Sequence, residues 1–121
     1  MEKITDKQAL TEFRAFINQR ASSGVFLART VTHMTLTDGV LTATFDPASI
    51  GMDQNIFDHI NVFPNLAEFV GTPLMFKDDQ GSRLRTCVTR VDTVSADGTS
   101  LGSATAAELY RAGTGEDLPT S

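Results

Sequence analysis

The first apolar positions of the chain repeat every three or four residues, which is the spacing of one face of an α-helix. They are Ala9, Leu10, Phe13, Phe16 and Ile17. Thr5 precedes them, with Gln8 three residues later, and this pair is typical of a capping box at a helix start. The polar residues 22–24 end the pattern. We therefore expect a helix that begins at Thr5, ends near Arg20 and packs through one apolar face.

The next two segments have the composition of β-strands, because they are rich in β-branched and aromatic residues. They span Val25 to Leu36 and Val40 to Phe45, and apolar and threonine residues alternate along most of the second. Asp38-Gly39 lies between them and is typical of a tight hairpin turn, since these residues tolerate positive φ. The sequence therefore predicts a β-hairpin with one well-buried face.

The segment from Asp53 to Phe76 is the densest cluster of large apolar residues in the chain. Pro64 argues against one continuous helix, because its ring would clash with the carbonyl four residues earlier. We expect two short helices with a break near Asn61, the first capped by Asp53 and the second ending at Gly71. The expected buried positions are Ile56, Phe57 and Ile60 in the first helix, and Leu66, Phe69 and Val70 in the second.

Three more strands are expected after Gly71, over residues 74–77, 83–94 and 101–111, joined by turns rich in Asp and Gly. With the hairpin they would form a single antiparallel five-stranded sheet in the α+β class. The N-terminal helix and the two short helices, as a lid, would cover it in the order α-β-β-α-α-β-β-β. Residues 1–111 would be one domain, and residues 112–121 have the composition of a disordered tail.

Charge and composition narrow the classes of partner and compartment. Ten basic and fifteen acidic residues give a net charge of −5, which disfavours binding to nucleic acid or to an anionic membrane. The polar N-terminal segment is not followed by an apolar run, so we expect no secretory signal and no membrane span. One cysteine, Cys87, allows no internal disulfide, and the two histidines lie far from it. We therefore expect a cytoplasmic protein without a metal site or a cofactor.

The candidate chemistry lies in the two short helices. His59 followed by Leu66-Ala67-Glu68 resembles the signature of hotdog-fold thioesterases. The resemblance implies that Glu68 activates water or attacks the thioester, while a backbone N–H after His59 polarises the carbonyl. The chain departs from that signature at Ile60-Asn61, where the family has two glycines, and at Pro64 in the family's continuous helix. A small acyl thioesterase using Glu68 and His59 is therefore the alternative hypothesis.

The order of elements resembles that of the PAS and profilin-like group. Ile50-Gly51 and the later Asn55-Ile56-Phe57 are similar to the segment where PAS helices begin. The resemblance implies a module that binds a small ligand beneath its helices or pairs with a second copy. The leading hypothesis is therefore a small non-catalytic ligand-binding or protein-interaction module that forms a homodimer.

A small-molecule ligand would lie between the helical lid and the small residues of the last strand, Gly102, Ala104 and Ala106. Such small residues allow a helix to pack closely or leave space for a ligand. Arg83 and Arg85 would share a strand face, where a guanidinium can meet a carboxylate. The candidate ligand-binding residues are Phe57, His59, Phe63, Glu68 and Arg85.

Overall fold

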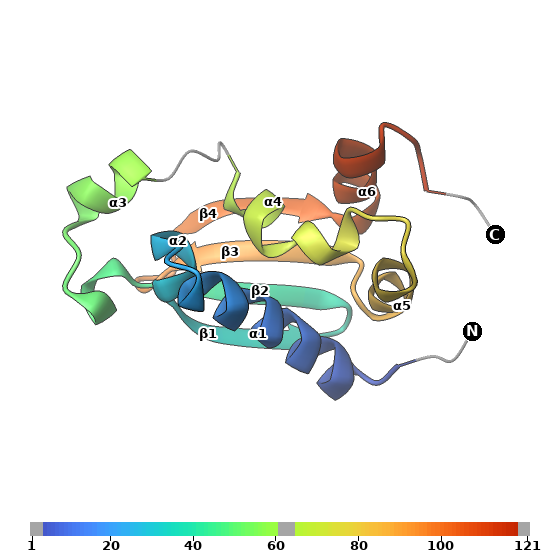
Figure 1. Ribbon diagram of the computed structural model, residues 1–121, viewed down its shortest axis with the longest axis horizontal. Helices are drawn as coiled ribbons and strands as arrows, with labels where there is room; N and C mark the ends of the chain where they lie inside the picture. The colour runs from blue at the N-terminus through green and yellow to red at the C-terminus, as the bar shows by residue number, and fades with distance from the viewer. Residues whose placement is uncertain (1–3, 61–64, 119–121) are drawn as a thin grey trace.

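The computed structural model describes residues 4–60 and 65–118 (Figure 1). The helices are α1 (Asp6–Ser22), α2 (Phe26–Arg29), α3 (Gln54–Ile60), α4 (Leu66–Val70), α5 (Asp79–Cys87) and α6 (Ala106–Thr114). The strands are β1 (Val31–Thr37), β2 (Val40–Phe45), β3 (Arg90–Ser95) and β4 (Ser100–Thr105). Short 3₁₀ turns, η1 (Pro47–Ile50) and η2 (Thr72–Leu74), precede α3 and α5.

The described residues form a four-stranded mixed sheet in the order β1-β2-β3-β4. β1 pairs antiparallel with β2, β2 pairs parallel with β3, and β3 pairs antiparallel with β4. Figure 1 shows α1 and α4 lying across one face of this sheet. On β2, Leu41, Ala43 and Phe45 are buried, whereas the alternating Thr42 and Thr44 are only half-buried. The α+β class is confirmed, but the expectation of five antiparallel strands is wrong.

The first helix and the hairpin turn follow the sequence signals. Thr5 Oγ1 accepts from the Gln8 backbone N–H at 3.1 Å, and Gln8 Oε1 accepts from the Thr5 N–H at 2.9 Å, so the capping box is formed. Asp38 and Gly39 have φ values of 52° and 80°, as a tight two-residue hairpin requires. The first strand begins later than expected, because α2 occupies the start of the segment assigned to it.

The central segment forms two helices, as predicted, but only one of the two first-helix positions that can be checked is buried. The Asp53 carboxylate accepts from the Asn55 N–H at 3.2 Å, which caps α3. Phe57 is buried, with its ring centroid 6.2 Å from that of Phe45. Ile56, in contrast, is 53% exposed. The expected break near Asn61 and Pro64 itself lie outside the described residues.

The second helix, α4, begins after Asn65, whose Oδ1 accepts from the Ala67 N–H at 3.0 Å. Its expected apolar positions, Leu66, Phe69 and Val70, are all buried. Gly71 ends α4 with an ordinary φ of −83°. Glycine is needed there for space, because an added Cβ would lie 2.5 Å from Leu109 Cδ1 on α6.

Of the three strands expected after Gly71, the first is absent, whereas β3 and β4 form within the second and third, whose remaining residues are helical. Residues 74–77 fall at the end of η2 and in the following turn, residues 83–87 belong to α5, and residues 106–111 belong to α6. Asp78 Oδ1 accepts from the Gly81 N–H at 2.7 Å, so the acidic segment starts a helix rather than a hairpin. Thr105 and Glu108 form a capping box that starts α6, which extends past Ala112, where the tail was expected to begin.

The small residues of β4 allow close packing of α4, which was one of the two alternatives open for them. Gly102 has a φ of +128°, and an added Cβ would collide with the Asn65 side chain. Asn65 Nδ2 also donates to the Ser103 carbonyl at 2.8 Å. The N-terminus of α4 is therefore held directly against β4.

We predict that Phe45→Ala lowers the free energy of unfolding by about 3 to 5 kcal/mol, because it leaves a cavity beside Phe57 in the core. Phe45 is fully buried, whereas Phe76 is 49% exposed. Phe76→Ala is therefore the matched control, with an expected loss below about 1 kcal/mol. Urea unfolding of both variants measures the difference, and equal losses would contradict this core.

We also predict that Gly102→Ala destabilises the protein by about 1 to 3 kcal/mol more than Gly98→Ala. Both glycines have positive φ, so both variants carry backbone strain. Only at Gly102 does the new methyl group meet a neighbour, Asn65, whereas nothing lies within 4 Å at Gly98. Thermal and urea unfolding of the two variants measure the difference, and a larger loss for Gly98→Ala would contradict the packing of α4 on β4.

Candidate functional site

The two residues of the thioesterase hypothesis lie on separate elements. His59 is an exposed residue of α3, with its ring Nδ1 2.9 Å from the Asn55 carbonyl oxygen. Glu68 is a half-buried residue of α4. Figure 1 shows α3 beyond the end of the sheet and α4 over β3 and β4. The structure does not bring the histidine and the carboxylate together, and their joint role stays a prediction.

Arg85 lies on α5 rather than on a strand, and its guanidinium binds the chain itself. Its Nη1 donates to the Leu74 and Phe76 carbonyls at 2.8 and 2.7 Å. The same group lies 4.7 Å from the centroid of the Tyr110 ring on α6. Burial lowers the pKa of Arg85 from its ordinary value. These contacts hold η2 and the turn after it against α5 and α6. The guanidinium N–H groups that were expected to meet a ligand therefore stabilise the fold.

The other candidate ligand residues are not gathered around a cavity either. Phe57 is buried in the core beside Phe45, and Phe63 lies outside the described residues. The space expected between the lid and β4 is occupied, because the Asn65 side chain fills the position beside Gly102. The remaining candidates for a binding site are therefore the edges of the sheet and the exposed surface.

The outer edge of β1 is the most distinctive of these places. Thr37 pairs with Val40 across a two-residue turn, which makes them a hydrogen-bonded pair. The alternation of an antiparallel ladder then turns the backbone groups of Leu36 and Met34 away from β2. Arg14 confirms this direction for Met34, because its Nη2 donates to the Met34 carbonyl at 3.3 Å.

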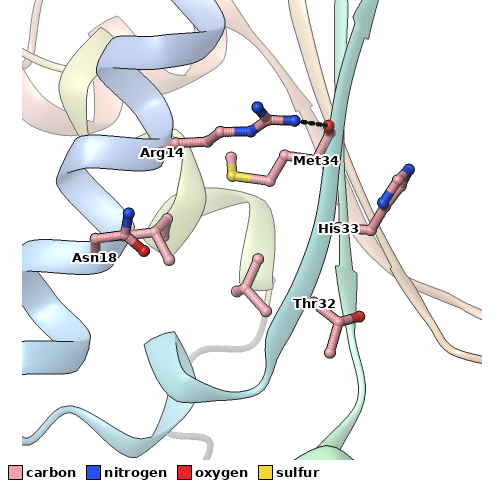
Figure 2. A pocket seen from close by; sticks show the side chains of 7 residues that line it. Arg14, Asn18, Thr32, His33 and Met34 are labelled. Carbon is pink, nitrogen blue, oxygen red and sulfur yellow. Dashed lines mark hydrogen bonds between the residues drawn. The ribbon is translucent and has the colours of Figure 1, made fainter.

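A groove of about 220 Å³ runs between α1 and this edge. It is lined by Arg14, Ile17 and Asn18 from α1, and by Val31, Thr32, His33 and Met34 from β1. Figure 2 shows Arg14 reaching across to the strand and the Met34 side chain pointing toward α1. His33 and Thr32 point the other way. The groove thus combines an outward-facing strand backbone with one guanidinium.

The two edges of the sheet are built differently. On β4, the Asn65 amide takes up the Ser103 carbonyl, and α4 packs beside it. β1 reads VTHMTLT and has no lysine, arginine, acid or proline of its own. Such residues are the usual means of preventing a sheet edge from pairing with another strand. A bulge between Val31 and His33 protects one end, so the segment from Met34 to Thr37 is the part open to pairing.

A second surface feature lies at one end of the molecule. Phe26 on α2, Ile50 at the end of η1 and Ile56 on α3 are 51%, 40% and 53% exposed. The Arg29 guanidinium lies 5.4 Å from the centroid of the Phe26 ring and covers part of it. Their elements contact one another, α2 with α3 and α3 with η1, and we call these three residues the apolar end.

Other kinds of site find no support in the described ranges. Within residues 4–60 and 65–118, no three His, Cys, Asp or Glu side chains gather as a metal ion would require. In the same ranges no helix has the length and apolar character needed to cross a bilayer. Scans against family models, curated proteins and solved structures find no match to this chain.

We predict that Arg85→Met lowers the free energy of unfolding by about 1.5 to 3 kcal/mol, because it leaves two backbone carbonyls without their charged donor. The matched control is Arg90→Met, since Arg90 is an exposed residue whose partner is Asp92. Loss of that surface pair costs at most about 1 kcal/mol. Urea unfolding measures both, and equal losses would show that Arg85 is free for another role.

Proposed function

We propose that this chain is a small non-catalytic protein-interaction module that binds an extended strand along β1. The observation that supports this most is the outer side of β1, which pairs with no other strand among the described residues, and where the outward Met34 carbonyl accepts from the Arg14 side chain. In strand addition, backbone hydrogen bonds provide affinity and neighbouring side chains provide specificity. Both are available at this edge.

The size of the groove favours a strand over a small molecule. Pockets for drug-sized ligands usually enclose roughly 300 to 1,000 Å³, whereas this groove encloses about 220 Å³. A strand needs less enclosure, because it is held mainly through its backbone. It would pair with the outward-facing groups of Met34 and Leu36 and extend the sheet beyond β1.

The chemistry beside the strand selects for an acidic side chain. Arg14 is exposed, and among the described residues it makes one hydrogen bond, to Met34, and no ion pair. A guanidinium has five N–H donors and binds a carboxylate in a planar, bidentate way. The preferred strand therefore has one acid placed near Met34, among β-branched residues, which favour the extended conformation.

We predict that a displayed library of random decapeptides yields strands of this kind when selected against the whole chain. Binding should be lost in Leu36→Pro, because proline removes the outward N–H, and kept in Leu36→Ala, which removes the same side chain but keeps the N–H. Circular dichroism checks that both variants fold. Peptides that bind Leu36→Pro and Leu36→Ala equally, or that bind only at the apolar end, would contradict the proposal.

A further inference from the structure

We infer that the strand bound by β1 is β1 of a second copy of this chain, paired antiparallel about a two-fold axis at Leu36. The inference rests on the proposed function, since it names the partner of the same edge. Such a contact is isologous, because both copies use the same surface. It would join two four-stranded sheets into one continuous sheet with the helices of both copies on the same face.

The charges at the β1 edge of one copy complement those at the β1 edge of a second copy. Arg14 lies at the Met34 carbonyl and makes no ion pair with any described residue. Asp38, in the turn after β1, is exposed and makes neither a hydrogen bond nor an ion pair within the described ranges. Met34 and Asp38 lie two residues on either side of Leu36. A two-fold axis at Leu36 therefore sets Met34, with Arg14 beside it, opposite Asp38 of the other copy, and does so twice.

The remaining pairs in this register also match. Thr35 lies opposite Thr37 of the other copy, and threonine pairs across an antiparallel ladder are favourable. Leu36, which is half-buried in the single chain, lies opposite its own symmetry mate. The outward-facing backbone groups of Leu36 then meet those of its symmetry mate, as a hydrogen-bonded pair of the ladder requires.

The neighbouring register is less complementary in charge. An axis at Thr35 would set Met34 opposite Leu36 and would leave both Arg14 and Asp38 without a partner. Each copy carries a net charge of −5, which opposes association. Two contacts between opposite charges at the edge reduce that repulsion where the copies meet. Charge therefore selects the axis at Leu36 over the one at Thr35.

Sedimentation of the whole chain over a dilution series tests the inference. The wild type should form a dimer, and Arg14→Glu and Asp38→Lys should each weaken dimerisation at least about tenfold, because each creates two like-charge contacts. The double variant should recover dimerisation to within about threefold of the wild type. Arg29→Glu, which reverses a charge at the apolar end, is the matched control and should leave the dimer unchanged.

Asp38 has positive φ, so Asp38→Lys strains the turn as well as reversing the charge. Asp38→Asn separates the two effects, because asparagine tolerates this conformation and removes only the charge. It should weaken the dimer less than Asp38→Lys but more than Arg29→Glu. Thermal unfolding of each variant shows whether the hairpin stays formed.

Cysteine cross-linking determines the register. In a Cys87→Ser background, Leu36→Cys should form a disulfide-linked dimer on mild oxidation, because the two positions face each other across the axis. Thr35→Cys should not, since its symmetry mate is displaced along the strand. Efficient cross-linking through Thr35→Cys instead would place the axis there and overturn the inference.

Three other results would also overturn it. The wild type could be monomeric at every concentration, or the double variant could fail to recover dimerisation. A dimer lost in Ile56→Ser but kept in Arg14→Glu would assign the interface to the apolar end. If the wild type is monomeric yet selected peptides still require the Leu36 N–H, only this inference fails. If peptides also fail to use that N–H, the proposed function fails with it.

Discussion

The parallel pairing of β2 with β3 is the constraint on which the rest of the structure depends. Two parallel neighbours cannot be joined by a tight turn, so the chain must cross from one end of the sheet to the other. That crossover contains α3, α4 and α5. Within it, α4 lies across the same face of the sheet as α1. The same pairing places the two hairpins side by side, which leaves β1 and β4 as the two edges.

The helices contact the two edge strands, β4 and β1, in different ways. Asn65, the N-cap of α4, donates to the Ser103 carbonyl and fills the space beside Gly102. The same side chain therefore caps its helix and covers part of the β4 edge. On β1, α1 packs on the face of the strand, and among the described residues the outward Met34 carbonyl accepts only from the flexible side chain of Arg14, which a new strand can displace or share. Within the described residues this edge pairs with no further strand and Arg14 makes no ion pair, and this difference is the physical basis of the proposed function.

Local signals in the sequence predicted local structure well. Thr5 with Gln8 and Asp38 with Gly39 act through groups a few residues apart, so their capping box and turn could be predicted without the fold. Thr105 with Glu108 is an equally local signal for the start of α6, but residues 101–111 were expected to form one strand. The parallel pairing joins segments far apart in sequence, and no local pattern encodes it. For the same reason the sequence does not single out Arg14, since its importance depends on β1 being an edge.

Hydrogen exchange at single amides, measured on the whole chain at several concentrations, tests the central claim most directly. The Thr35 and Thr37 amides face β2 and should be protected throughout, whereas those of Met34 and Leu36 face outward. The account predicts that the Leu36 amide gains protection as concentration rises, in step with dimer formation. Dimer formation without any slowing at the Leu36 amide would contradict it.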